Sequence, residues 1–501
     1  MCLKQLCARI YLLYNNGNGL KRKKKMKTIF EKDKKLHSKP LYIKNYEEVD
    51  FNKRTTPLNL PNTTELEVMR HYKELSDRNF CIEKGFYPLG SCTMKYNPRA
   101  NEAAARFDGF LNLHPLQDDK DCQGALELMY DLEQALKIIT GMDAITLQPC
   151  AGAHGEFCAM NIVKKYFFEK NQTKRKKVII PDNAHGTNPM SAKMNGFECV
   201  EVKSDQNGGV DFERLKELVN TNGEEIAAIM MTNPNTLGLF DEKILQISEL
   251  MHKNGSLLYY DGANLNAVMG HTNPRLMGFD IVHLNLHKTF STPHGGGGPG
   301  AGPVGVIKEL EPYLPVPTIE FDGEKYFRNY DKKHSIGKVS TFYGNFSVFI
   351  RAYTYILMMG NNLKNASSDA VLAANYIKEK LKKYFKLPYD RTCMHEFVLS
   401  GDLQKEKGVS TLMMAKRLMD SNCHPPTVYF PLIVHEAMMI EPCESETKEV
   451  LDNFINTMIE IAREAQNEPE KFGEYPLTTP VLKVDETLAA RHLNLKYEFN
   501  N

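Results

Sequence analysis

The sequence predicts an α/β fold in which a large domain has a mostly parallel sheet and a smaller α+β domain follows it. Two observations predict this fold. Short apolar runs alternate with helical patterns from residue 144 to residue 307, which is typical of a parallel sheet with helices on both faces. After about residue 312 the alternation gives way to mixed strands and helices. At 501 residues the chain exceeds the usual size of one core, so we expect two or three domains.

The start of the chain is basic and has little with which to build a core. None of the first 30 residues is Asp or Glu, and a basic run occupies Leu20–Lys25. The apolar piece Ile10–Tyr14 is too short for a secretory signal and precedes the basic run. With two arginines and no serine, the segment also differs from a mitochondrial transit peptide. We expect residues 1–60 to be a disordered extension and N-terminal arm, and leave open whether Met1 or Met26 is the natural start.

The large domain is expected over residues 61–312. Apolar runs predict strands near 144–148, 178–181, 199–203, 226–231, 257–261, 281–285 and 304–308. Helical spacing of apolar residues predicts helices over Thr64–Asp77, Ala125–Ile139, Phe157–Phe168, Phe212–Val219 and Lys243–His252.

The smaller α+β domain is expected over residues 313–472. A loop-rich stretch is predicted at Pro315–Lys338, and it leads into helices over Thr341–Met359 and Ala366–Tyr384. Further strands and helices are predicted at Glu396–Leu399, Ser410–Met419, Thr427–Phe430 and Lys448–Ala465. Residues 473–501 are expected to form a C-terminal tail with little core.

Composition excludes several classes of protein. Hydrophobic residues make up 42% and charged residues 25% of the chain, which is usual for a globular protein. A net charge of +1 gives no reason to expect nucleic acid or an anionic membrane as a partner. No apolar run approaches the roughly 18 residues of a membrane span. The 11 scattered cysteines contain no C-x-x-C pair, which favours a reducing compartment, and we expect a cytoplasmic protein.

Lys288 is the first candidate for chemistry. The apolar run Phe279–Leu286 predicts a buried strand that delivers this lysine to its end. Desolvation disfavours the charged form of a lysine. An uncharged amine is what carbonyl chemistry requires, including a Schiff base to pyridoxal phosphate. A lone lysine more often extends from a loop into solvent, so Lys288 does not decide the function by itself.

Asp261 and Ala263 supply two further requirements of a pyridoxal phosphate site. Asp261 ends a second apolar run, Leu257–Asp261, and Lys288 follows it by 27 residues. An acid beside the pyridine nitrogen keeps the ring protonated, and the protonated ring is an electron sink. A small residue such as Ala263 lets the ring lie against the backbone. An acid at a strand end is also a common helix N-cap, and this alternative stays open.

Two more loops follow predicted strands. Ala151, Gly152 and Ala153 open a predicted helix, and small residues at a helix start let backbone N–H groups approach a phosphate. His185 follows the run Val178–Pro181 and is suited to stack on a ring or to move a proton. Each loop alone is weak evidence, but open α/β sheets bind ligands at the carboxyl ends of parallel strands. We therefore expect these loops to form one site.

Six motifs together resemble one enzyme family. They are YPLGSCTMKYNPR (Tyr87–Arg99), HGTNPMSA (His185–Ala192), MTNPNTLGLF (Met231–Phe240), YYDGANLNAVMG (Tyr259–Gly270), NLHKTFSTPHGGGGPG (Asn285–Gly300) and, more loosely, PPTVYFPLIVHEAMMIEP (Pro425–Pro442). The chain is similar to the glycine cleavage system P-protein, glycine dehydrogenase (decarboxylating). Its length matches the lysine-bearing, C-terminal half of the single-chain form, so it resembles subunit 2 of the split form.

The resemblance implies the fold, the reaction and the partners. It implies the aspartate-aminotransferase-like fold of pyridoxal-phosphate-dependent transferases (fold type I). Glycine would be decarboxylated, and the aminomethyl group would pass to the lipoyl arm of the H-protein. Lys288 would hold the cofactor and act in catalysis with His185, while Asp261, Ala263 and Ala151 to Ala153 would bind the cofactor. Thr187 and His287 are further candidates. The other subunit of the glycine dehydrogenase would be a partner in an α2β2 assembly.

Alternatives remain at this stage. Another fold-type-I enzyme, such as an amino-acid decarboxylase, aldolase or aminotransferase, would use the same lysine and acid. A non-catalytic assembly subunit is a second alternative, against which the intact Lys288 and Asp261 argue. The spacing of His283, His287 and His294 is compatible with a metal, but a zinc site usually also needs a carboxylate or cysteine ligand and a second shell that orients its ligands, and we expect no metal site.

Overall fold

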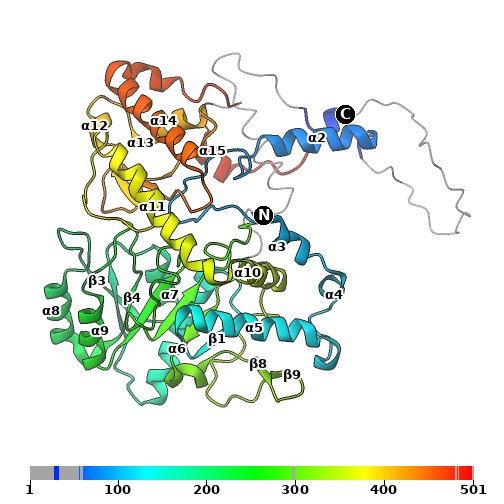
Figure 1. Cartoon of the computed structure of the whole chain (residues 1–501), viewed down its shortest axis with the longest axis vertical. Coiled ribbons are helices and arrows are strands. Elements are labelled where there is room, and N and C mark those ends of the chain that lie inside the picture. The colour runs from blue at the N-terminus through cyan, green and yellow to red at the C-terminus, as the bar shows by residue number, and fades with distance from the viewer. Residues whose placement is uncertain are drawn as a thin grey trace, which may run out of the picture. The chain divides into compact units, whose positions relative to one another are not determined.

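The computed structural model describes residues 27–32, 56, 60–295, 300–479, 482 and 484–498 (Figure 1). The chain forms two compact units: one comprises Gly85–Tyr475, and the other comprises Met1–Lys84 with Pro476–Asn501. The possible start at Met26 and most of the predicted N-terminal arm lie outside the described residues. The domain boundaries given above remain predictions.

The unit that contains both chain ends has three short described elements. They are η1 (Phe30–Lys32), α2 (Glu65–Asp77) and α15 (Glu486–Arg491). Helix α2 begins with a capping box, in which Thr64 and Glu67 satisfy each other's backbone N–H groups. The Phe30 ring stacks on Tyr497 with ring centroids 4.8 Å apart.

A seven-stranded sheet is the centre of the unit Gly85–Tyr475, and it confirms the predicted fold class. Its strands are β1 (Ala144–Thr146), β2 (Lys177–Pro181), β3 (Glu198–Val202), β4 (Ile226–Met231), β5 (Leu257–Gly262), β6 (Ile281–Leu284) and β7 (Val304–Val306). Their order is β1-β7-β6-β5-β4-β2-β3. Only β7 pairs antiparallel with its neighbours, β1 and β6. Each of the seven predicted strands is present within a few residues of its expected place.

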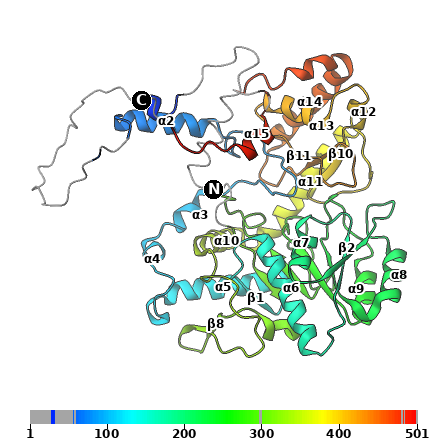
Figure 2. The same cartoon turned by 180° about the vertical axis from the view of Figure 1, so that it is seen from behind.

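Both faces of this sheet are covered, as the apolar strands predict. In β4, Ile229 and Met231 join the core beneath α5 (Gln123–Thr140), α8 (Phe212–Asn222), α9 (Ile244–Lys253) and α10 (Phe346–Met359). Their neighbours Ala228 and Met230 join a second core beneath α6 (Gly152–Glu169) and α7 (Thr187–Met194). Successive side chains point to opposite faces of a strand, and strands buried on both faces are apolar at every position. Helix α6 is followed most easily in Figure 2.

Every predicted helix of this unit is present with shifted ends, and the structure adds short helices outside the predicted ranges, among them α3 (Arg99–Ala104), α4 (Asp108–Leu111) and α12 (Asp402–Lys405). Their bounds are α3 (Arg99–Ala104), α4 (Asp108–Leu111), α5 (Gln123–Thr140), α6 (Gly152–Glu169), α7 (Thr187–Met194), α8 (Phe212–Asn222), α9 (Ile244–Lys253), α10 (Phe346–Met359), α11 (Leu363–Leu381), α12 (Asp402–Lys405), α13 (Thr411–Met419) and α14 (Lys448–Asn467). The predicted helix from Thr341 therefore begins five residues late. Asp211 caps α8 by accepting the Arg214 N–H, and Gly141 ends α5 with φ of 72°.

The C-terminal part of this unit has its own sheet and core. Strands β10 (Phe397–Ser400) and β11 (Thr427–Val428) both pair antiparallel with β12 (Ala437–Ile440). Helices α11, α13 and α14 pack their apolar faces on this sheet. The strand β12 was not predicted, although the sheet is built around it.

The prediction of loops over Pro315–Lys338 was wrong in part. Two strands, β8 (Thr318–Phe321) and β9 (Tyr326–Asn329), form an antiparallel hairpin there. Asp322 at its turn accepts backbone N–H groups of Glu324 and Lys325, which stabilises the short connection. No helix in the described part of the chain is long and apolar enough to cross a membrane.

Candidate functional site

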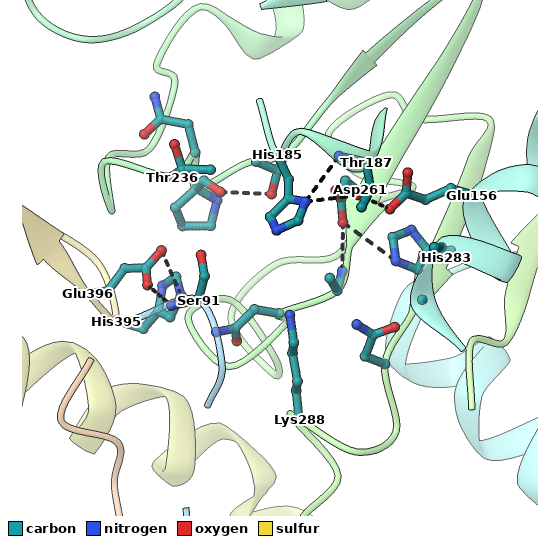
Figure 3. Close-up of a pocket in the computed structure, with 18 of the residues that line it drawn as sticks. Ser91, Glu156, His185, Thr187, Thr236, Asp261, His283, Lys288, His395 and Glu396 are labelled. Carbon is teal, nitrogen blue, oxygen red and sulfur yellow. Dashed lines mark hydrogen bonds and ion pairs between the residues drawn. The ribbon is translucent and has the colours of Figure 1, made fainter. Parts of the chain in front are cut away.

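A cavity of about 240 Å³ lies at the carboxyl ends of the parallel strands, where the loops after β2, β4, β5 and β6 meet (Figure 3). It brings together eight of the nine predicted cofactor-binding residues: Gly152, Ala153, His185, Thr187, Asp261, Ala263, His287 and Lys288. The ninth, Ala151, is exposed and immediately precedes α6. Parallel strands whose loops converge at one edge explain why residues more than 100 positions apart share this cavity.

Asp261 is the second-last residue of β5 and is buried. Its carboxylate accepts the side-chain N–H of Asn188 at 2.8 Å and the backbone N–H of Ala263 at 3.1 Å. His283 Nε2 lies 3.6 Å from Asp261 Oδ1. Burial works against the charged carboxylate, but His283, these two hydrogen bonds and Lys288 outweigh it and lower the pKa of Asp261. Asp261 is therefore held as an anion, and its N-cap alternative is not realised because Ala263 and Asn264 do not begin a helix.

Lys288 lies in the turn that follows β6, four residues after the strand ends at Leu284. It is half-buried, and its side chain lines the cavity. Its amine makes no hydrogen bond or ion pair with any residue that the structure describes (Figure 3). The prediction placed Lys288 directly at the strand end. The structure instead ends the strand earlier, because Leu286 already bonds to Ala301 across the turn.

The start of α6 forms a close-packed wall of the cavity. A Cβ atom on Gly152 would lie 2.6 Å from Asn285 Oδ1, and one on Gly302 would lie 2.1 Å from the carbonyl oxygen of Ala151. Only glycine fits at such distances. The side-chain oxygen of Asn285 is buried without a partner among the described residues. The first backbone N–H groups of a helix are free to bind an anion, so this wall is suited to hold a phosphate.

Glu156, one turn into α6, connects this wall to the loop that carries His185. Its carboxylate accepts the hydroxyl of Thr187 at 2.6 Å and that of Ser191 at 3.0 Å. Thr187 Oγ1 in turn lies 2.9 Å from His185 Nδ1. Burial, followed by the charge of Asp261, raises the pKa of Glu156 to about 8. The network holds His185 at the cavity, and Glu156 was not predicted because a buried acid inside a helix leaves little trace in the sequence.

The histidines near Lys288 are uncharged. Burial, then His294 and Lys288, lower the pKa of His287 to about 3. Burial also lowers the pKa of His283, whose Nδ1 is hydrogen-bonded to the hydroxyl of Tyr259. The rings of His287 and His294 meet edge to face, with centroids 5.4 Å apart. His283 is therefore held by Tyr259, whereas His287 and His294 contact each other.

A second group of polar residues lines the cavity and was not predicted as a site. Ser91, His395 and Glu396 lie on one side of Lys288 in Figure 3, and Asp261 and His283 lie on the other. The backbone N–H of Ser91 donates to Glu396 Oε2 at 2.7 Å. A His-Glu pair directly before the apolar run of β10 was the only sequence signal.

The fold and this cavity define a class, the fold-type-I transferases that depend on pyridoxal phosphate. The Aminotransferase class-V family matches residues 153–298, and the family described as Glycine dehydrogenase, C-terminal domain, matches residues 366–484. A glycine decarboxylase (P-protein) structure in inhibitor-bound form aligns with a TM-score of 0.66 at 18% identity, over 81% of this chain and 92% of that one. The cysteine desulfurase CsdA from Escherichia coli aligns with a TM-score of 0.58 at 13% identity, over 77% of this chain and 98% of that one.

Curated relatives narrow this class. A protein of Caldanaerobacter subterraneus subsp. tengcongensis named "Probable glycine dehydrogenase (decarboxylating) subunit 2" is 59% identical over 88% of this chain and 90% of its own length. Relatives with the same name from Bacillus cytotoxicus and Staphylococcus aureus are 57% and 58% identical, each over 89% of this chain and 90% of their own length. The chain belongs to the glycine dehydrogenase (decarboxylating) subunit 2 family.

Proposed function

We propose that this chain, with bound pyridoxal phosphate, decarboxylates glycine and passes the aminomethyl group to the lipoyl arm of a carrier protein, the H-protein. The observation that carries the proposal is one cavity with a buried anion, Asp261, and a lysine without a partner, Lys288. Membership of the glycine dehydrogenase subunit 2 family supports glycine as the substrate.

The residues of the cavity fit pyridoxal phosphate. Lys288 would hold the aldehyde carbon through its amine, and Asp261 would pair with the ring nitrogen. The start of α6 at Gly152 and Ala153, together with Thr187, would bind the phosphate, since N–H and O–H donors converge there. The side-chain oxygen of Asn285, which has no hydrogen-bond partner among the described residues, is a further polar atom in this wall. When bound, the cofactor supplies an electron sink for the pair released as CO2 leaves.

The chain's own residues would orient the reactants and exclude water. His185 is held by Thr187 and, through it, by Glu156, so its ring is placed to pack on the cofactor and to guide protons. Asn188 fixes the Asp261 carboxylate. Burial lowers the pKa values of His283 and His287, so these rings line the cavity as neutral groups. Water must be kept out, because a carbanion that meets water is protonated before it can react with sulfur.

The partners follow from the family name. Subunit 2 requires a second glycine dehydrogenase subunit, and we propose an α2β2 assembly with it. We propose the cytoplasm as its location. All nine cysteines that the structure describes are free thiols, which is usual in a reducing compartment.

An absorption spectrum of the chain, co-purified with its partner subunit, tests the proposal. We expect the absorption of a lysine-linked cofactor, a change of that spectrum on adding glycine, and glycine-dependent release of CO2 only when a lipoylated carrier is present. CO2 release without a carrier would instead favour a simple decarboxylase of the same fold. Absence of cofactor absorption, with the partner present, would favour an assembly subunit without catalytic function.

A further inference from the structure

Three buried titratable groups meet at the edge of the cavity. His395 and Glu396 directly precede β10, and Glu441 directly follows β12. One ligand-type atom of each lies within 4.8 Å of the others. All three are nearly inaccessible to solvent, with His395 at 3%, Glu396 at 2% and Glu441 at 0% exposure. Nothing in the proposed function above uses this group.

The hydrogen bonds distinguish the two carboxyls. Glu441 accepts three donors: the backbone N–H of Thr93 at 2.9 Å, the hydroxyl of Thr93 at 2.7 Å and the side-chain N–H of Asn264 at 2.7 Å. Among the described residues, Glu396 accepts only the backbone N–H of Ser91, on Oε2. Hydrogen-bond donors favour the charged carboxylate. Glu441 therefore has the donors that stabilise a carboxylate, and Glu396 has fewer of them.

Glu396 is the group that keeps a proton. Two buried carboxylates in contact cannot both be charged at low cost. Burial, and then Glu441, raise the pKa of Glu396 well above its ordinary value, against the opposing effects of Ser91 and Lys288. The other groups near Glu396 are His395, Cys92 and Cys393, and burial leaves all three uncharged by lowering the pKa of the histidine and raising those of the thiols.

His395 indicates that the cluster faces a ligand. Both of its ring nitrogens are buried without a hydrogen-bond partner among the described residues. Its Nε2 lies 3.6 Å from Glu396 Oε1, too far for a hydrogen bond. An unpartnered buried polar group is destabilising, so a structure retains one mainly where a bound molecule satisfies it. His395 and Glu396 both line the cavity that holds Lys288.

We propose that Glu396 is the general acid that protonates the sulfur released when the acceptor disulfide is cleaved. This inference rests on the proposed function. The bond from the α-carbon of glycine to its carboxyl breaks and CO2 leaves. The electron pair of that carbon forms the bond to one sulfur, the S–S bond breaks, and its pair stays on the second sulfur. That sulfur takes the Glu396 proton and becomes a thiol, so glycine is oxidised and the disulfide is reduced. Glu396 regains a proton from solvent.

Infrared spectroscopy tests the proton without requiring activity. The complex with the partner subunit, at neutral pH and without glycine, should show protonated-carboxyl absorption, and the component due to Glu396 should be lost in Glu396→Gln while the component due to Glu156 remains. Both components should remain in Glu406→Gln, a control at an exposed acid of the same subdomain. In Glu441→Gln, Glu396 no longer has a charged neighbour. As the pH is raised, its band should therefore disappear at a lower pH than in the wild type. Absorption that is unchanged in Glu396→Gln would overturn the proposal.

Two acceptors test the role of the proton. With the lipoylated carrier, Glu396→Gln should transfer the aminomethyl group about 10²–10⁴-fold more slowly, as usual for loss of a general acid. With an aryl disulfide, whose low-pKa thiol leaves readily as an anion, the loss should be less than tenfold. Equal losses with both acceptors would contradict the proposal. Zinc content is a further test. One equivalent of zinc per chain in the wild type and none in Glu441→Gln would also contradict the proposal, since a cation at these three groups would displace the proton.

Failure of the proposed function is distinguishable from failure of this inference. If neither the wild type nor Glu406→Gln releases CO2 from glycine, the proposed function is wrong, whatever the variants at Glu396 do. If both release CO2 at equal rates and Glu396→Gln matches them with the lipoylated carrier, the function stands and the role of Glu396 is wrong. In Glu441→Gln, the alkaline limb of the rate profile should move to lower pH, which a purely structural role of Glu441 would not produce.

Discussion

The side-chain N–H of Asn188, at the start of α7, donates to Oδ2 of Asp261, at the end of β5, over 2.8 Å. The two residues are 73 positions apart in the chain and meet because β2 and β5 end at the same edge of the sheet. The bond stabilises the charged form of Asp261 in a buried place. A fixed negative charge at this point is what an electron-accepting ring opposite Lys288 requires.

Replacing Asp261 by Asn keeps the shape of the site and removes its charge. We expect glycine-dependent CO2 release to fall by about 10²–10³-fold, the usual effect of removing one preorganised electrostatic partner. The cofactor should remain attached to Lys288, as judged by the mass of the peptide after borohydride treatment. Asn188→Ala removes one hydrogen bond that stabilises the charged Asp261 but leaves the carboxylate in place, so it should lose less activity than Asp261→Asn. Equal rates in Asp261→Asn and the wild type would rule out the assigned role of Asp261.

Gly302→Ala tests the wall at the start of α6. The new methyl group would lie 2.1 Å from the carbonyl oxygen of Ala151, so Ala151 and the helix start must move. Such overpacking costs about 1–3 kcal/mol, and we expect pyridoxal phosphate to bind at least tenfold more weakly in an absorbance titration. Gly124→Ala is the control, because a Cβ there has nothing within 4 Å. Unchanged cofactor affinity in Gly302→Ala would remove the helix start from the binding site.

The buried ion pair between Lys95 and Glu444 is expected to be structural. The two side chains are 2.7 Å apart, and Lys95 also donates to Asn266 and Tyr355. Removing one partner, as in Lys95→Met or Glu444→Gln, should lower the free energy of unfolding in urea by about 3–5 kcal/mol, since it leaves a polar group or charge buried alone. The double variant Lys95→Met/Glu444→Leu should recover part of this loss. Additive losses would show that the two residues act independently.

The pH dependence of stability should report on Glu156. Its folded-state pKa of about 8 lies above the ordinary value of 4.5, so its contribution to stability is fully present below pH 4.5 and is lost as the pH rises through 8. In the cofactor-free protein, the melting temperature of Glu156→Gln relative to the wild type should therefore increase between pH 5 and pH 9. Glu406→Gln should show no such trend. If the difference in melting temperature between Glu156→Gln and the wild type does not change with pH, Glu156 is not buried as a neutral acid.

The sheet and the polar ends of its strands could be predicted because local patterns determine them. The run Leu257–Asp261 is apolar until its last residue, so the strand and its acid are visible together. The hairpin β8–β9 was missed because its burial is only partial along both strands. Strand β12 was missed because Ala437, Met438 and Met439 favour helices, and its place is fixed by β10 and β11, which pair with it from distant positions.

The half of the site near Lys288 and Asp261 was predictable, and the half near Glu396 was not. In an α/β sheet, a Lys, Asp or His at the carboxyl end of a strand indicates a ligand-binding site. Glu396 precedes β10 and Glu441 follows β12, two strands of a different sheet, and Glu396 reaches the cavity only through tertiary packing. Glu156 and Asn188 act through hydrogen bonds to partners 31 and 73 residues away, and no sequence spacing encodes such bonds.

Glycine-dependent exchange of labelled bicarbonate is the most direct test of the central claim. The chain is assayed with its partner subunit and a lipoylated carrier, as the wild type, as Lys288→Ala and as Lys407→Ala, an exposed lysine control. We predict exchange in the wild type and in Lys407→Ala, and none above background in Lys288→Ala, with borohydride fixing the cofactor to the peptide that contains Lys288. Full exchange in Lys288→Ala, or cofactor fixed to a different lysine, would contradict the account.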